Sequence, residues 1–389
     1  MEIPHDEQQA GTLEPAGSQA ASPPPHLAEP PINLPPPPRG HLLNQIFMGP
    51  QGLRAGWSVL IFLLLAGLFS FLLLSTMGHA HLIARKPSFT PRFMFFSELA
   101  QLVSLLAAAA VMARIERRRL ADYNLTGPRR TAHFFSGLAV GFAALSALVG
   151  GLTAGHWLRF NGLALNGIDI LRWGAFWGLL FLMVGCFEEG SFRCYLQWTL
   201  TRGLNFWWAL GILAAACAVT AARARGNGVW GAYAIVLIGL IPCYLLHRKA
   251  APRSGFWQAA WVTSALFALA HTSNGGENWI GIFAAGAIGF VFCVSIYMTG
   301  SAWWAIGTHA GWDWAETYFY GTPDSGLVAK GHLLNTSPVG NVFWSGGSDG
   351  PEGSALILGI LVLLFIWLMV VYGRNRGEAA LTQERSGSM

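Results

Sequence analysis

The first stretch of the chain with residues suited to catalysis is CFEEGSFRCYLQ, a run of polar side chains inside an apolar segment. Glu188 and Glu189 are adjacent, so on a helix their side chains point about 100° apart. Glu189 and Arg193 are four residues apart on one helical face, where they can form an ion pair. Glu188 is then left without a local partner, and an unpaired carboxylate in an apolar environment suits a general base. The alternative is that both acids are structural.

Two further stretches, FALAH and HAGWDW, carry histidines. His271 ends an apolar run, one helical turn after Phe267, and a lone histidine at such a place is more often structural. His309 and Asp313 are four residues apart, so both point to one side of a helix. Such a pair could be a metal ligand with its orienting carboxylate, or it could hold a water molecule.

Composition shows which elements must position these side chains. Of the 389 residues, 53% are hydrophobic and 11% are charged, whereas soluble domains carry roughly 25% charged residues. The net charge of +5 comes from basic residues beside apolar runs, which indicates membrane topology and no nucleic-acid partner. The low charge predicts that lipid surrounds most of the chain.

A membrane-spanning helix needs about 20 mostly apolar residues. We therefore predict an all-α fold, a polytopic transmembrane bundle of about eight to ten helices within residues 51–375. The fifth, seventh and ninth segments are short or polar, and the ninth contains Gly307 and Gly311, which allow close backbone approach. The ten segments are 57–77, 95–115, 134–154, 171–200, 206–222, 229–246, 256–271, 279–298, 301–318 and 355–372.

The two ends of the chain and the basic loops suggest an orientation. Residues 1–50 are proline-rich and predict a disordered tail, and 376–389 predict a second one. Six arginines lie in or beside 114–130, which places that loop in the cytoplasm. We expect an integral protein of the cytoplasmic membrane with its N-terminus inside and the loop 319–354 outside.

The three motifs together make a stronger case than any of them alone. Two glutamates, two histidines, an aspartate and an arginine lie on helices otherwise nearly free of charge, and each would be costly facing lipid. Gathering them around one wet cavity removes most of that cost. A carboxylate with two imidazoles can activate water or hold a divalent ion. The soluble-zincin string H-E-x-x-H is absent, so the site must be assembled from separate helices.

EEGSFR, FALAH and HAGWD, in this order, resemble the EExxxR, FxxxH and HxxxN/D motifs of a known family. It is the CAAX-processing and bacteriocin-processing protease family, also called type II CAAX prenyl endopeptidases or Abi proteins. The resemblance covers about 171–318. Cys194 replaces the usual glycine, and Asp313 stands where asparagine is frequent. The long gap between the first two motifs suggests that the fifth and sixth helices are an inserted hairpin.

The resemblance implies an intramembrane endopeptidase in which each motif has a role. Glu188 would activate the attacking water, and His271 would help to hold that water or a metal ion. His309 and Asp313 would stabilise the oxyanion or complete a ligand set. An ionised aspartate cannot donate to an oxyanion as asparagine can, so that role of Asp313 is open.

The resemblance also implies supporting residues, a cofactor and a substrate class. Glu189 and Arg193 would brace the first motif, and Phe267 would support the site. The cofactor would be a divalent metal, zinc first among them, although a metal-free glutamate mechanism is equally open. The substrate would be a peptide or a membrane-protein segment, such as a prenylated C-terminus or a leader peptide, reached from the surrounding lipid. The metal ligands would be Glu188, His271 and His309.

Two other functions are compatible with the same residues. A buried set of glutamate, histidine and arginine also makes proton relays, so a proton-coupled transporter is one alternative. A non-catalytic membrane scaffold or regulator of the same fold is the other. Glu188→Gln separates the three functions. It should abolish peptide cleavage in a protease, abolish ion flux in a transporter, and leave the biological activity of a scaffold unchanged.

Overall fold

The computed structural model describes residues 46–49, 51–83, 90–223, 228–249 and 253–387, and it is built almost entirely of helices. The predicted proline-rich tail falls mostly outside these residues. The all-α prediction is confirmed, since eight helices of the described residues are long and apolar enough to cross a membrane. The long helices are α2 (Ala55–His79), α3 (Pro91–Ile115), α4 (Arg130–Ala154), α5 (Ile168–Glu189), α7 (Phe206–Arg223), α8 (Gly228–Arg248), α9 (Ser254–His271), α10 (Trp279–Thr299), α11 (Trp303–Asp313) and α13 (Leu356–Gly387).

Three helices carry motifs, and two of them, α9 and α11, are not among those eight candidate membrane-spanning helices. Helix α11 has only 11 residues and continues as the π-helix η3 (Trp314–Tyr320). Helix α5 likewise continues through the π-helix η2 (Gly190–Leu196) into α6 (Gln197–Thr201). A π-helix widens one turn and is found frequently at functional sites. In both cases the π-helix begins directly after a motif carboxylate, Glu189 or Asp313.

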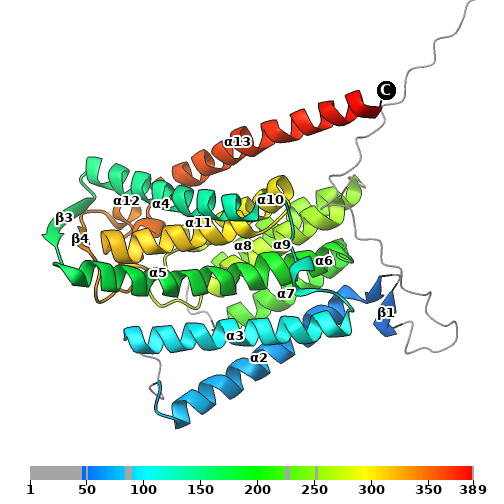
Figure 1. The fold of residues 1–389 in the computed structure, drawn as a ribbon, viewed down its shortest axis with the longest axis horizontal. Coiled ribbons are helices and arrows are strands. Elements are labelled where there is room, and N and C mark those ends of the chain that lie inside the picture. The colour runs from blue at the N-terminus through cyan, green and yellow to red at the C-terminus, as the bar shows by residue number, and fades with distance from the viewer. Residues whose placement is uncertain (1–45, 50, 84–89, 224–227, 250–252, 388–389) are drawn as a thin grey trace, which may run out of the picture.

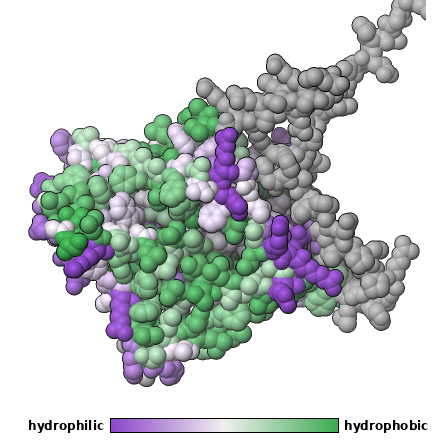
Figure 2. Space-filling model, in the orientation of Figure 1, coloured by the Kyte–Doolittle hydropathy of each residue, from purple (hydrophilic) through white to green (hydrophobic). Residues whose placement is uncertain are grey.

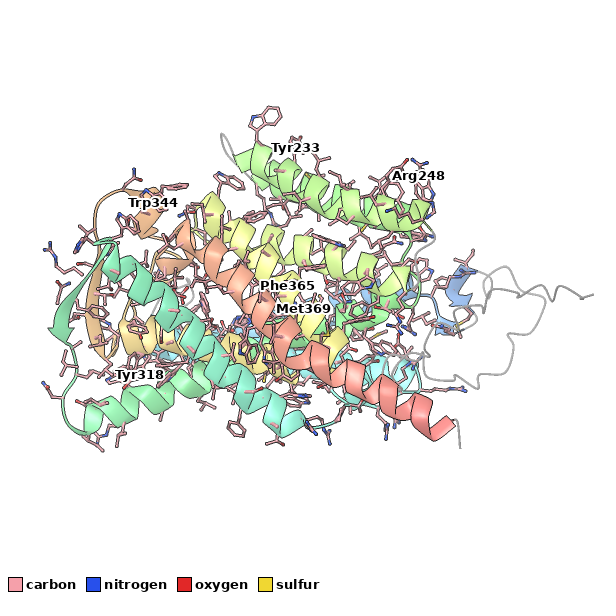
Figure 3. The ribbon with its side chains drawn as sticks, turned by 90° about the horizontal axis from the view of Figure 1, so that it is seen from above. Tyr233, Arg248, Tyr318, Trp344, Phe365 and Met369 are labelled. Atoms are coloured by element: carbon pink, nitrogen blue, oxygen red, sulfur yellow. The ribbon has the colours of Figure 1, made fainter. Side chains whose placement is uncertain are left out.

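The helices run side by side, with α11 between α5 and α4 (Figure 1). Helices α2 and α3 pack together beside α5, and α13 crosses the opposite side of the bundle, where Figure 3 labels Phe365 and Met369. A middle zone of apolar surface separates hydrophilic patches at the two ends (Figure 2). Exposed side chains such as Leu64, Phe71 and Leu363 belong to long helices. This surface fits a protein that is integral to a membrane.

Four glycines bring the backbones of α4 and α11 into direct contact. A Cβ atom on Gly141 would lie 2.1 Å from the carbonyl oxygen of Thr308, and equivalent additions on Gly137, Gly307 and Gly311 would meet backbone oxygen at 2.1–2.2 Å. The close approach predicted for Gly307 and Gly311 is therefore present, with α4 as its partner. The hydrophobic effect does not drive helix association in lipid, and small residues at such crossings allow the close van der Waals packing that does.

Helices α7 and α8 form a hairpin that packs against α9 at one edge of the bundle. Figure 3 shows α8 at this edge, with Tyr233 and Arg248 labelled near its two ends. The core between these three helices is apolar and includes Leu213, Val262 and Ala265. Ala268 and Leu269 of FALAH belong to the same core, so the hairpin packs against part of the second motif, and its origin as an insertion stays a prediction.

Irregular structure covers one end of the bundle, where the sequence predicted only a loop. Strand β3 (Leu158–Leu163) pairs antiparallel with β4 (Leu334–Pro338), followed by the short helices α12 (Val342–Ser345) and η4 (Pro351–Gly353) (Figure 1). The remaining short elements are β1 (Met48–Gly49), β2 (Gly52–Leu53) and η1 (Leu120–Asp122).

The C-terminal end differs from the expectation of a disordered tail over 376–389. Helix α13 continues to Gly387, and 388–389 lie outside the described residues. The sequence from Glu378 to Leu381 consists of strong helix formers, which explains why the helix extends beyond its apolar part.

Candidate active site

The first motif ends α5 and places its two glutamates in different surroundings. Glu189 is fully buried, and its Oε2 lies 3.2 Å from Nε of Arg193, also fully buried. The predicted ion pair is therefore confirmed, although its angle does not make it a hydrogen bond. Glu188 points elsewhere, keeps 27% of its side chain exposed, and has an Oε2 atom without a hydrogen-bond partner. Glu188 is the carboxylate free to act on a bound molecule.

Arg193 is held by aromatic rings as well as by its carboxylate. Its guanidinium carbon lies 4.2 Å from the centre of the Phe267 ring and 5.6 Å from that of Phe292. Its Nη2 atom also approaches α10 so closely that a Cβ on Gly289 would lie 2.3 Å away. A cation over aromatic faces is stabilised by the ring quadrupole. The arginine thus ties the first motif to α9 and α10.

His309 links the first motif to the third. Its Nδ1 donates a hydrogen bond of 2.8 Å to Oε1 of Glu189. Its Nε2 then faces Oδ2 of Asp313 at 3.4 Å and Oε2 of Glu188 at 3.8 Å. Both separations exceed a direct hydrogen bond, so Nε2 has room for a third group. One nitrogen of His309 orients the ring, and the other faces the two carboxylates.

His271 enters from the C-terminal end of α9. Its Nδ1 donates a 2.9 Å hydrogen bond to the carbonyl oxygen of Phe267, which leaves Nε2 with its lone pair in the neutral ring. The Phe267 ring lies 4.5 Å from the His271 ring and 6.4 Å from the His309 ring, between centroids. Phe267 therefore packs against both imidazoles and against Arg193.

A single cavity of about 180 Å³ joins these groups. At roughly 30 Å³ per water it has space for about six waters. Its apolar lining comes mainly from α5, α9, α10 and α13. All four predicted catalytic residues line the cavity, whereas Glu189 and Arg193 do not. The lining includes Glu188, His271, His309 and Asp313, with Phe181, Val184, Phe267 and Phe292. The structure brings the three motifs together, and the catalytic roles of these residues stay predictions.

The cavity residues do not form a ready-made metal site. Nδ1 of His309 is taken by Glu189, and Nδ1 of His271 by a backbone carbonyl. Within the part of the chain that the structure describes, no three His, Cys, Asp or Glu side chains are placed to hold a metal ion. Glu188, His271 and His309, the ligand set that the family resemblance implies, line one cavity, and their role as metal ligands stays a prediction.

Several polar residues in the cavity were not foreseen from the sequence. Glu316, Asp324 and Glu352 line it together with Trp312 and Asn274. Glu316 follows His309 by seven residues and lies in the predicted ninth segment, so the rule that singled out the other buried charges would have found it. Asp324 and Glu352 come from the irregular end cap, where no local pattern marks them.

The fold and this cavity define a polytopic membrane protein with an acid–imidazole site. Residues 244–315 match a family model described as Rce1-like, the Type II CAAX prenyl endopeptidases. The matched segment contains FALAH and HAGWD, and it begins after EEGSFR. It confirms the family resemblance of these two motifs and indicates a peptidase of the membrane, whereas EEGSFR lies outside the matched residues. No curated protein and no solved structure gives a significant match.

Proposed function

We propose that the protein is an intramembrane endopeptidase that hydrolyses a peptide bond with water activated by Glu188. The observation that carries this proposal is the shared cavity in which the unpartnered Oε2 of Glu188 faces Nε2 of His309. A peptide carbonyl in the same space would lie within reach of a water held between them. A general base must first lie within hydrogen-bonding reach of the proton that it accepts, and its pKa matters only once that condition is met.

The steps follow from the acceptors and donors available. Glu188 accepts a proton from the water as its oxygen attacks the carbonyl carbon, and the carbonyl oxygen becomes an oxyanion. A protonated His309, balanced by Glu189 and Asp313, donates from Nε2 to that oxyanion. Glu188 then passes its proton to the leaving amine as the C–N bond breaks. His271 holds the water through Nε2.

The remaining residues act by position. Asp313 orients the His309 ring and does not contact the oxyanion, because two negative charges would repel each other. Glu189 fixes His309 through Nδ1, and Arg193 balances Glu189. Phe267 packs between these groups. All four are positioning residues in this proposal.

A cleavage assay tests the proposal. Purified protein in phosphatidylcholine vesicles is mixed with a library of membrane peptides that includes prenylated C-terminal peptides and leader peptides. Glu188→Gln should lower turnover by about 10²- to 10⁴-fold. Asp169→Asn, which changes an exposed acid at the start of the same helix, should leave turnover unchanged. Equal turnover in Glu188→Gln and the parent protein contradicts the role of Glu188.

The same preparation addresses the metal and the two alternatives. Loss of cleavage with chelator and its return with zinc would support the metal-dependent mechanism implied by the family resemblance. Ion flux abolished by Glu188→Gln would support a proton-coupled transporter instead. A biological activity unchanged by that substitution, with no cleavage, would support a scaffold.

A further inference from the structure

The cavity extends beyond the three motifs into an acidic end. Glu316, Asp324 and Glu352 line it in addition to Glu188 and Asp313, and no lysine or arginine of the described residues does. Glu316 follows His309 by seven residues along one helix, which corresponds to about 10 Å. A peptide residue spans at most about 3.6 Å, so this acidic end is about three residues away from the bond at His309.

Glu316 has hydrogen-bonding capacity that the protein leaves unused. The residue is 1% exposed, and its Oε1 atom has no hydrogen-bond partner. Its Oε2 accepts from Nε1 of Trp312 at 3.1 Å, and the same N–H also faces Oε1 of Glu352 at 2.6 Å. The buried Glu316 and the half-buried Glu352 therefore share one donor. Leaving a buried acceptor unpaired lowers stability, and a ligand with several donors would recover that loss.

The end cap adds a third carboxylate without adding a positive charge. Oδ2 of Asp324 accepts from the Thr317 hydroxyl at 2.9 Å. Burial raises the pKa of Asp324 and of Glu352 because it disfavours the charged form, and repulsion from neighbouring carboxylates adds to the rise. A cationic ligand in this place would relieve that repulsion and would keep the acids ionised.

The shape of the acidic end favours an organic cation over a metal ion. No three carboxylates of the described residues are placed to hold a metal. An ammonium or guanidinium group offers three or five donors, which can reach separate carboxylates. The adjoining wall is apolar, with Ile357 and Leu361 from α13, and an alkyl stem can pack along such a wall. A lysine or arginine side chain has both parts.

We infer that the acidic end of the cavity binds a lysine or arginine side chain of the substrate, a few residues from the cleaved bond. This inference rests on the proposed peptidase function and adds a substrate class to it. Specificity then comes from charge complementarity, since a neutral side chain of the same length would leave Glu316 and its neighbours unpaired.

The test uses two peptide series that are identical except at one position. Each peptide carries one lysine or one norleucine, moved stepwise along a leucine–alanine sequence. Binding is measured by fluorescence anisotropy on the full-length Glu188→Gln protein in phosphatidylcholine nanodiscs, because neutral lipid does not attract lysine. At the favoured position, lysine should bind about tenfold more tightly than norleucine. Equal binding of both series at every position overturns the inference.

Variants localise the preference to this end of the cavity. Asp324→Asn and Glu352→Gln, each added to Glu188→Gln, should reduce the lysine preference to less than about threefold. Asp349→Asn is the matched control, because Asp349 is a buried acid of the same end cap but does not line the cavity. A preference kept in both cavity variants overturns the inference. Melting temperatures show whether each variant is folded. The comparison of lysine and norleucine peptides on Glu188→Gln alone tests the inference even if both cavity variants fail to fold.

Cleavage by the parent protein separates this inference from the proposed function. Cleavage without regard to lysine supports the peptidase and overturns the acidic subsite. A lysine preference in binding, with no cleavage of any peptide by the parent protein, overturns the peptidase and leaves a cation-binding cavity.

Discussion

His309 and Glu189 are joined by a 2.8 Å hydrogen bond between Nδ1 and Oε1. The same carboxylate contacts Arg193 through its other oxygen, so one glutamate couples the third motif to the first. Because Glu189 and Arg193 are both fully buried, neither charge can be compensated by solvent. The orientation of the His309 ring therefore depends on an ion pair that does not line the cavity.

Glu189→Gln is expected to unfold the protein more easily and to reduce activity. The neutral amide leaves Arg193 as a buried, uncompensated charge, which costs about 3–5 kcal/mol. Thermal denaturation in detergent checks this loss. Asp169→Asn breaks an exposed ion pair with Arg172 on the same helix, and it should change stability by no more than about 1 kcal/mol. Equal melting temperatures of the two variants would show that the buried pair is not needed.

Gly141→Ala should force α4 away from α11 and displace the third motif. The added Cβ would lie 2.1 Å from the carbonyl oxygen of Thr308, the residue before His309. Overpacking of this kind costs about 1–3 kcal/mol. Gly150→Ala on the same helix is the control, because a Cβ there meets nothing within 4 Å, and alanine favours helix over glycine. The melting temperature should fall in Gly141→Ala and should not fall in Gly150→Ala. A fall of the same size in both variants would contradict the close crossing of α4 and α11.

Most of the bundle could be predicted because helices that cross lipid are encoded locally. The predicted segment 134–154 corresponds to Arg130–Ala154, and 279–298 to Trp279–Thr299. The β3–β4 pair could not be predicted, because Leu158 pairs with Pro338 across about 180 residues of chain. Such pairing depends on how the helices bring two loops together, and no short pattern records it.

The candidate site was predictable where charge stood out against apolar helices and unpredictable elsewhere. Glu188 and His309 were found in this way. The contact between Glu189 and Arg193 also followed from helical spacing and is present, whereas the catalytic role of Glu188 stays a prediction. Asp324 and Glu352 belong to the end cap, where acids are unremarkable in sequence. Their place in the cavity depends on tertiary structure alone.

Stability should fall as the pH rises from about 4 to about 7, partly through Asp349. Burial raises the pKa of this carboxyl from 3.8 to about 7. The folded protein therefore holds a proton in this range that the unfolded chain has released, so protonation stabilises the fold and the gain is lost as the pH increases. The buried acids Glu277, Asp324 and Glu352 have raised pKa values and act in the same direction.

Asp349→Asn isolates the contribution of this one group. The amide oxygen can still accept from the backbone N–H of Asn278, as Oδ2 of Asp349 does at 2.9 Å, but the side chain no longer ionises. The melting temperature of the variant should decline less between pH 5 and pH 8 than that of the parent. Parallel pH profiles of the two proteins would mean that Asp349 does not titrate in this window.

The acidic end of the cavity should face the side of the membrane opposite to the N-terminus. The arginines in or beside 114–130 predict that this loop is cytoplasmic, and the irregular end cap with β3 and β4 lies at the other end of the bundle (Figure 1). Ser348→Cys and Arg130→Cys, both at exposed positions of these two ends, can be labelled in intact cells with a maleimide that does not cross membranes. The native cysteines are buried or partly buried and should react little. We expect Ser348→Cys to react at once and Arg130→Cys only after lysis, and the reverse result would invert the topology and put the acidic subsite on the cytoplasmic side.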